Sequence, residues 1–244
     1  MDKEASGFNT NQTVAIVGLG LIGGSYARGL RRIGADHIIA VDPDEKALNQ
    51  AKQEGMVDEI YTSGNEALKQ ADLVIFCTAA DVMIRFLAEN KAFFTPGTIL
   101  TDVAGIKGDT ATAIAALLPE GVDFVPGHPM AGREGRGYAM ASADIFNGAN
   151  YILVPMEGND EDHILAVKNM AMAWAWLPCR PRDARRPRPV HRLYQQPASR
   201  PGDGSGQQRI HEYADQVFCS RQLPRRDTSR RYQRPAVDET VLIQ

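Results

Sequence analysis

Cysteine is scarce in this sequence, and long apolar runs are absent from it. The 244 residues include three cysteines, Cys77, Cys179 and Cys219, too few and too scattered for a disulfide framework or a zinc site. No run of about 18 apolar residues occurs, which argues against a membrane-spanning helix. The polar, acidic start of the chain, MDKEASGFNTNQT, does not resemble a secretory signal. We therefore expect a cytoplasmic protein that holds no metal and enters no membrane.

Lysine is missing from positions 173–244, although arginine is abundant there. Positions 1–172 carry 13 basic and 23 acidic side chains, a balance of −10, whereas positions 173–244 carry 14 arginines and 7 acids, a balance of +7. The second part also holds 8 of the 14 prolines. Leu, Ile, Val and Phe make up only about 15% of it, below the ~20% at which a packed core becomes doubtful. We expect residues 176–244 to be poorly ordered.

Strands and helices are predicted to alternate along the globular part. Apolar, β-branched runs predict strands at 13–17, 37–41, 73–77, 98–103, 122–125 and 151–154. Helical spacing predicts helices at 25–32, 44–54, 82–92, 107–118 and 160–172. Such alternation is typical of βαβ units and a parallel sheet. The sequence therefore predicts an α/β domain with a doubly wound parallel sheet over 13–155, and a further helical segment over 156–175.

A glycine-rich loop lies between the first predicted strand and the first predicted helix. It reads Gly18-Leu19-Gly20-Leu21-Ile22-Gly23. In a dinucleotide-binding loop, the first glycine permits the tight turn, the second lets the backbone approach a pyrophosphate, and the third allows close packing of helix and strand. The pyrophosphate then meets free N–H groups at the positive end of the helix. The alternative is a glycine turn that binds another ligand or none.

Asp42 is the candidate for choosing the cofactor. It ends the second predicted strand. An acid that follows the glycine motif at this distance, about 20 positions on, accepts a hydrogen bond from a ribose 2′-hydroxyl. A carboxylate at this place repels a 2′-phosphate. The sequence therefore favours NAD over NADP.

His128 is the candidate for chemistry on a hydroxylated substrate. It lies between Gly127 and Pro129, just after a predicted strand, where the backbone is stiff. An alcohol dehydrogenation needs a group that polarises or deprotonates the hydroxyl as hydride leaves, and histidine suits that role near neutral pH. The alternative is a turn histidine bonded to backbone. The remaining histidines have no comparable setting, and we interpret them as structural or surface residues.

Four segments of the sequence resemble the prephenate dehydrogenase family of tyrosine biosynthesis. They are VAIVGLGLIGGSYARGLRR, VDPD, LTDVAGIKG and PGHPMAGREGRGYAMASADIFNGANYILVP, and GHPMAG-x-E is the most specific block. The resemblance runs from about residue 13 to about residue 172. It implies an oxidoreductase that uses NAD(P)+ to oxidise prephenate, with loss of CO2, to 4-hydroxyphenylpyruvate. It also implies a Rossmann domain followed by an all-helical dimerisation domain.

The resemblance also implies roles for individual residues. His128 resembles the family's histidine that binds the substrate hydroxyl. Glu134 resembles an acid near the mouth of the site, and Lys107 resembles the lysine after the fifth strand. Gly105 stands where the family often has serine, so any hydrogen bond from that serine to the cofactor or to His128 is missing here.

The last third of the chain does not resemble the family. The family's S-x-L-P-H and R-D-x-T-R segments do not occur in residues 173–244. Read one base later, however, codons for 193–200, 223–231 and 231–244 admit the family-like stretches STSSLPH, FRDATRVA and ADINGPLWTKLFLS. One constant shift in the family's order predicts an inserted base, or two lost, near codons 173–176. The alternative is a basic tail for nucleic acid or anionic surfaces, but lysine, interleaved aromatics and a fold motif are lacking.

Three functional hypotheses follow. The first is an NAD-dependent prephenate dehydrogenase by ancestry, in which we expect the substrate pocket and the family's homodimer not to form. The second is a non-catalytic dinucleotide-binding or regulatory module. The third is an arogenate or other β-hydroxyacid-type dehydrogenase. NADH binding together with prephenate turnover separates the first two, and contacts to the substrate side chain separate the third.

Overall fold

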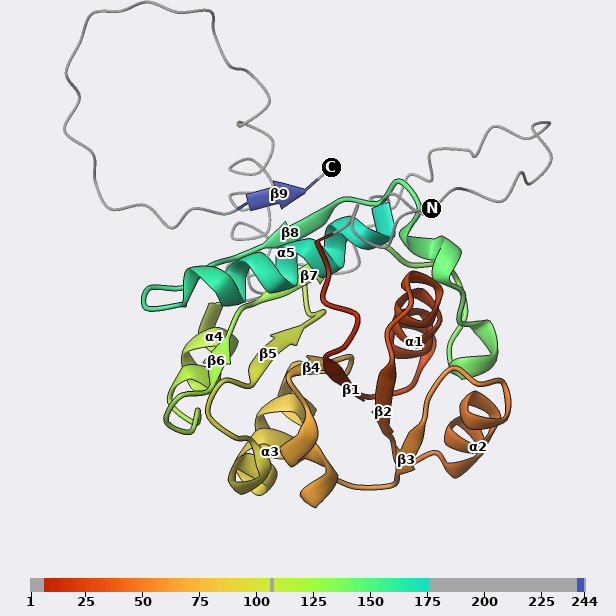
Figure 1. Cartoon of the computed structure of the whole chain (residues 1–244), viewed down its shortest axis with the longest axis horizontal. Helices are drawn as coiled ribbons and strands as arrows, with labels where there is room; N and C mark the ends of the chain where they lie inside the picture. The colour runs from red at the N-terminus through yellow and green to blue at the C-terminus, as the bar shows by residue number, and fades with distance from the viewer. Residues whose placement is uncertain (1–6, 106–107, 176–240, 244) are drawn as a thin grey trace, which may run out of the picture. The chain divides into compact units, whose positions relative to one another are not determined.

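The computed structural model describes residues 7–105, 108–175 and 241–243 (Figure 1). The expectation that residues 176–244 are poorly ordered therefore lies outside the described residues, except at 241–243. The same holds for the proposed change of reading frame and for the role given to Lys107.

The strands are β1 (Thr13–Val17), β2 (His37–Val41), β3 (Glu59–Tyr61), β4 (Leu73–Phe76), β5 (Ile99–Asp102), β6 (Asp123–Phe124), β7 (Gly127–Pro129), β8 (Tyr151–Leu153) and β9 (Val241–Ile243). The helices are α1 (Leu21–Ile33), α2 (Glu45–Gln53), α3 (Ala80–Asn90), α4 (Gly108–Ala115) and α5 (Glu161–Ala175). Short 3-10 helices lie at Glu66–Gln70, Lys91–Phe93, Tyr138–Met140 and Ala143–Phe146. Each predicted strand and helix is present, with ends that differ by at most four positions. Strands β3, β7 and β9 were not predicted.

Six strands form one parallel sheet in the order β3-β2-β1-β4-β5-β6. This is the order of a Rossmann fold, and it confirms the predicted doubly wound sheet. After β1, the chain adds β2 and β3 on one side of β1. It then crosses back and adds β4 on the other side of β1, so the strand order reverses between β1 and β4. The glycine loop follows β1 and therefore lies at this reversal, which is where open α/β sheets bind ligands.

Both faces of the parallel sheet are buried. Val14 and Ile16 of β1 pack into a core with residues of α1, α2 and α5, including Leu30 and Val167. Alternate residues of β1, such as Val17, enter a second core with α3 and α4. Figure 1 shows α3 on one side of the sheet and α1 with α5 on the other. Because helices cover both faces, the strands read as continuous apolar runs.

A second, antiparallel sheet corrects two sequence-based expectations. Residues 151–154 were predicted as the last strand of the parallel domain, but β8 pairs antiparallel with β7. Val241–Ile243 lie in the segment expected to be poorly ordered, yet they pair with β8 as β9. An apolar triplet with two β-branched residues pairs readily with the unpaired backbone groups of an edge strand. Pairing between residues so far apart cannot be read from local sequence.

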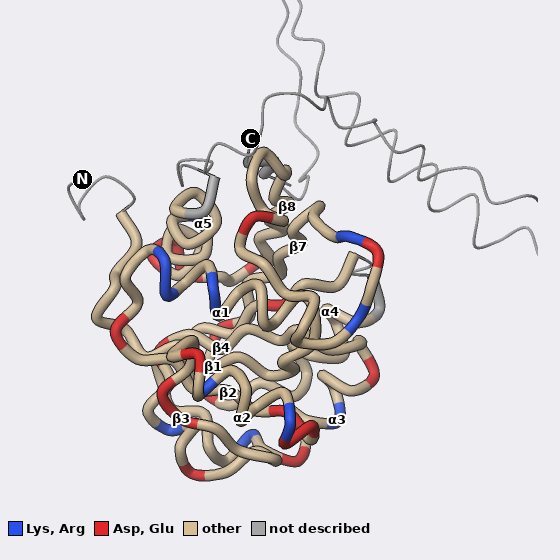
Figure 2. Tube along the Cα trace, turned by 90° about the vertical axis from the view of Figure 1, so that its right-hand side faces the viewer, with Lys and Arg blue, Asp and Glu red and all other residues tan. Residues whose placement is uncertain are grey.

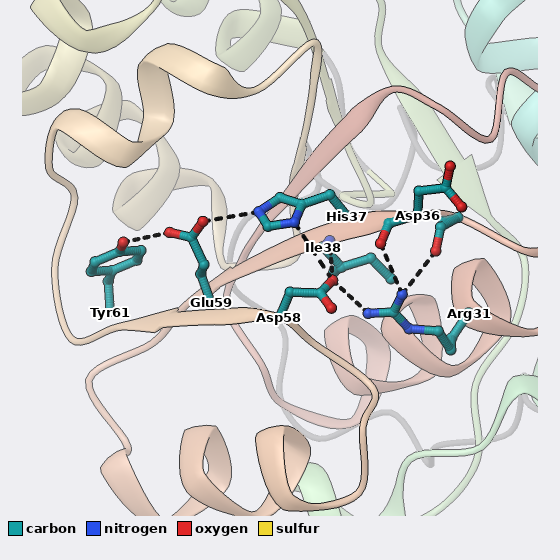
Figure 3. A network of polar contacts seen from close by, with 8 residues as sticks. Arg31, Asp36, His37, Ile38, Asp58, Glu59 and Tyr61 are labelled. Carbon is teal, nitrogen blue, oxygen red and sulfur yellow. Dashed lines mark hydrogen bonds and ion pairs between the residues drawn. The ribbon is translucent and has the colours of Figure 1, made fainter.

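A polar network fastens α1, β2 and β3 at the amino ends of the strands (Figure 3). Arg31 of α1 reaches the Asp58 carboxylate at 2.6 Å. His37 at the start of β2 contacts Glu59 at 2.9 Å, and the Tyr61 hydroxyl donates to the same Glu59 carboxylate at 2.5 Å. These contacts lie at the edge of the sheet opposite the glycine loop. We therefore assign them to the stability of the fold.

Charges of both signs are interspersed along the described trace, and Figure 2 shows no broad region of a single sign. In the described part of the chain, no helix is both long and apolar enough to cross a membrane.

Candidate active site

The glycine loop is held between the ends of β2 and β4. Gly18 has φ +93°, a left-handed conformation that favours glycine, and its N–H donates to the Val41 carbonyl at 2.8 Å. A Cβ at Gly18 would lie 2.8 Å from Thr78 Cγ2 and 2.9 Å from the Cys77 carbonyl oxygen. A side chain at this position would therefore clash with the segment after β4.

The other two glycines of the motif differ sharply in their surroundings. A Cβ on Gly23 would lie 1.8 Å from the Gly18 carbonyl oxygen, so a side chain there is incompatible with this turn. A Cβ on Gly20 would meet nothing within 4 Å. Gly23 is thus required by the protein's own packing, whereas Gly20 faces open space in which a ligand can approach the backbone.

The start of α1 fits an anionic ligand. Gly20 is the N-cap residue and supplies no side-chain hydrogen bond, and the first turn contains no acidic residue. The first N–H groups of a helix lack partners within the helix and carry the positive end of its dipole. These features suit the pyrophosphate of a dinucleotide. Leu19 is fully buried, so this residue of the loop faces the core of the protein.

Asp42 braces the glycine loop from the end of β2. Its Oδ2 accepts a hydrogen bond from the Leu19 N–H at 2.5 Å, and its Oδ1 accepts one from the Asp44 N–H at 2.8 Å. Sequence reasoning assigned Asp42 to a ribose hydroxyl and missed this contact within the protein. Each carboxylate oxygen has a second lone pair, so the brace leaves capacity for a ribose hydroxyl.

His128 lies on β7 with its imidazole half-buried. Its Nδ1 is 2.7 Å from the carbonyl oxygen of Val103, the residue after β5. A carbonyl can only accept a hydrogen bond, so Nδ1 carries the proton, and in the neutral ring Nε2 keeps its lone pair. A Cβ on Gly105 would lie 3.4 Å from Nε2. A serine at 105 would therefore stand beside this nitrogen.

The glycine loop and His128 are joined through the ends of β4 and β5. The Val103 N–H donates to the Phe76 carbonyl at 3.2 Å, which connects the ends of these two strands. Gly18 packs against Cys77 on one side of this connection, and Val103 holds His128 on the other. The two features that sequence reasoning singled out therefore share the carboxyl edge of the parallel sheet.

Three ionisable side chains buried behind this edge of the sheet stay neutral. Burial raises the pKa of the Cys77 thiol, and the negative charge of Asp102 raises it further. Burial likewise raises the pKa of the Tyr26 and Tyr151 hydroxyls. A thiol with a raised pKa is a poor nucleophile, so we assign Cys77 no chemical role.

Glu134 is exposed on the segment that follows β7, and no hydrogen bond or ion pair joins it to His128 in the described structure. The role of Glu134 at the mouth of the site stays a prediction. Lys107 lies outside the described residues. Within those residues, no group of three or more His, Cys, Asp or Glu side chains is arranged to hold a metal ion.

Strand order, glycine loop and helix start together define a dinucleotide-binding α/β domain of the Rossmann class. Residues 26–174 match the family model described as "Prephenate dehydrogenase, nucleotide-binding domain". This match covers more than half of the chain. The chain belongs to the prephenate dehydrogenase family.

Individual relatives agree with this assignment. The chain is 32% identical over 162 residues to a prephenate dehydrogenase of Bacillus subtilis, which covers 65% of this chain and 43% of that protein. It is 29% identical over 143 residues to a cyclohexadienyl dehydrogenase of Zymomonas mobilis, covering 58% of this chain and 48% of that protein. The chain thus spans less than half the length of either relative.

Solved structures give the same picture. A prephenate dehydrogenase from Aquifex aeolicus, in complex with hydroxyphenyl propionate and NAD+, has a TM-score of 0.62 and 27% identity, over 67% of this chain and 57% of that one. An arogenate dehydrogenase from Synechocystis has a TM-score of 0.62 and 29% identity, over 67% and 57% of the two chains.

Proposed function

We propose that this chain carries the dinucleotide-binding half of an NAD-dependent dehydrogenase of the prephenate type. The observation that carries the proposal is the tie between His128 and Val103. It leaves Nε2 as a proton acceptor at the sheet edge that also holds the glycine loop. An acceptor beside a dinucleotide cradle is what oxidation of an alcohol requires.

Cofactor binding is assigned to the glycine loop and Asp42. The backbone at Gly20 and the first N–H groups of α1 would hold the pyrophosphate, and Asp42 would accept from the adenosine ribose. The Asp42 carboxylate would repel a 2′-phosphate, which supports NAD rather than NADP. When bound, the nicotinamide would accept hydride from the substrate's ring carbinol.

His128 is assigned the proton chemistry. Nε2 accepts the proton of the substrate hydroxyl as the carbinol carbon becomes a carbonyl, and Nδ1–H stays on Val103. The fixed ring direction spares the reaction the cost of orienting a base. Glu134 and Lys107 are assigned to the mouth of the site by resemblance to the family.

Prephenate is the proposed substrate, and we propose that the 244-residue chain turns it over poorly. The resemblance assigns prephenate's carboxylate anchor and the homodimer to the family's second half, whose R-D-x-T-R segment this chain lacks. Losing a charged anchor removes both substrate binding and orientation.

The test compares this chain with a second protein, which is encoded by the same gene after deletion of one base near codon 174. NADH binding is measured by fluorescence, and NADH formation is measured with prephenate and with arogenate. We expect both proteins to bind NADH and only the second to turn over prephenate. In the second protein, His128→Ala should lower the rate by about 10²–10⁴-fold with NADH affinity unchanged.

His163→Ala is the matched control, because His163 is also half-buried but contacts Asp123 at 3.1 Å near the start of α5. Full turnover by the His128→Ala protein would refute the assigned chemistry. NADH binding without turnover in the second protein would favour a non-catalytic module, and a preference for arogenate would change the substrate. Robust prephenate turnover by the unchanged chain would refute its proposed impairment.

A further inference from the structure

Asp102 is a buried carboxylate that links the two sheets of the domain. It is the last residue of β5 and is 1% exposed. Its Oδ2 accepts a hydrogen bond from the Ala104 N–H at 3.1 Å, and its Oδ1 accepts one from the Gly127 N–H at 3.2 Å. Burying a carboxylate is costly, and hydrogen bonds to both oxygens offset that cost. Sequence reasoning assigned Asp102 no role.

The two hydrogen bonds that Asp102 accepts come from the neighbours of Val103 and of His128. Ala104 directly follows Val103, whose carbonyl accepts from Nδ1 at 2.7 Å. Gly127 directly precedes His128 on β7, so its position sets the position of the His128 backbone that carries the imidazole. The carboxylate thus fixes both the acceptor of the ring's proton and the backbone that carries the ring.

Asp102 also bridges two sheets that share no strand pairing. β5 pairs with β4 and β6, whereas β7 pairs with β8. A Cβ on Gly127 would lie 2.1 Å from the Tyr151 hydroxyl oxygen, so the glycine backbone is also closely packed against this side chain. Because it is bonded to Asp102 and packed against Tyr151, the β7 backbone at Gly127 has little freedom to shift.

We propose that Asp102 is the positioning residue of His128, and that it fixes the tautomer and direction of the imidazole by holding Val103 and Gly127 together. The catalytic value of this positioning rests on the proposed function. The geometry itself can be tested without catalysis. Asparagine is nearly isosteric with aspartate, but its NH2 group cannot accept a hydrogen bond. Asp102→Asn therefore breaks one of the two ties.

The experiment uses the full 244-residue chain with 15N-labelled histidine. NMR of the ring nitrogens reports the tautomer, and His128→Gln identifies the His128 signals among the five histidines. We expect Nδ1–H to dominate at His128 in the unchanged chain. Asp102→Asn should reduce that preference by about tenfold, the equivalent of one ordinary hydrogen bond. NADH affinity should change by less than about threefold, because Ala104 and Gly127, which donate to Asp102, lie outside the glycine loop.

Thr98→Val is the control for a purely structural effect. Thr98 is 2% exposed near the other end of β5, and its hydroxyl donates to the Ala71 carbonyl at 3.2 Å. It should lower the melting temperature and leave the His128 tautomer unchanged. Asp102→Ser serves as a second variant if Asp102→Asn does not fold, because it also keeps one acceptor oxygen and removes the buried charge.

An unaltered His128 tautomer in a folded Asp102 variant would overturn the proposal. Failure of both variants to fold would also overturn it, since Asp102 would then maintain the fold rather than the imidazole. Absence of NADH binding by the unchanged chain would refute the proposed function instead, and the tautomer measurement would still decide the role of Asp102.

Discussion

Leu19 and Asp42 are joined by a 2.5 Å hydrogen bond from the backbone N–H of the glycine loop to carboxylate Oδ2. The residue that is assigned to recognise the ribose therefore also shapes the loop that is assigned to hold the pyrophosphate. A change at Asp42 should alter both cofactor preference and overall affinity.

Asp42→Ser tests this double role. In the unchanged chain we expect NAD(H) to bind at least about tenfold tighter than NADP(H), because the carboxylate repels a 2′-phosphate. The variant should narrow this gap and also weaken NADH binding, since the Leu19 N–H loses a charged acceptor. Titration of each dinucleotide, followed by fluorescence, measures both effects.

Asp44→Ser is the matched control for Asp42. Asp44 caps α2 by accepting from the N–H groups of Lys46 and Ala47, and serine is also a good N-cap. The dinucleotide preference should not change in this variant. Equal affinities for NADH and NADPH in the unchanged chain would contradict the role given to Asp42.

Two glycines of the loop should fail in different ways when changed to alanine. Gly23→Ala places a methyl group 1.8 Å from the Gly18 carbonyl, so the turn must open; overpacking of this kind typically costs about 1–3 kcal/mol of stability, or more. Gly20→Ala meets no protein atom within 4 Å and should leave the melting temperature nearly unchanged. It should nevertheless weaken NADH binding by about tenfold or more, because the methyl occupies the pyrophosphate's approach.

Thermal unfolding and NADH titration of these two variants distinguish packing from ligand contact. Unchanged NADH affinity in Gly20→Ala would mean that the pyrophosphate does not approach the loop at this point.

Tyr61→Phe should destabilise the fold more at neutral pH than at acid pH. The Tyr61 hydroxyl donates to Glu59 and, together with His37, lowers the pKa of that carboxyl below its usual 4.5. A depressed pKa adds stability above the unfolded value, and this is lost as the pH falls through the folded value. We expect a loss of about 1 kcal/mol near pH 7 that becomes smaller at acid pH, where Glu59 is protonated and accepts a weaker hydrogen bond.

Urea unfolding at both pH values measures this difference. Glu66→Gln is the control, because the Glu66 side chain is 79% exposed and its pair with Lys69 contributes little at any pH. A Tyr61→Phe effect of equal size at neutral and acid pH would show that the hydroxyl stabilises the fold independently of the Glu59 charge.

Local sequence features were enough to predict the parallel sheet and to single out the glycine loop, Asp42 and His128. These follow from local properties: apolar strands buried on both faces, helical spacing, and glycines where a side chain would clash, as at Gly18 and Gly23. The absence of lysine and the shortage of apolar residues separated the last third of the chain in the same way.

The contacts between these parts could be learned only from the folded chain. β7 and β8 form a separate antiparallel sheet. Asp42 accepts a hydrogen bond from the Leu19 N–H, and the Val103 carbonyl accepts one from Nδ1 of His128. The role proposed for Asp102 depends on its hydrogen bond from Gly127, which lies 25 positions further along the chain. Hydrogen bonds between distant segments depend on where the fold brings each backbone group, and no periodicity or spacing in the sequence encodes that meeting.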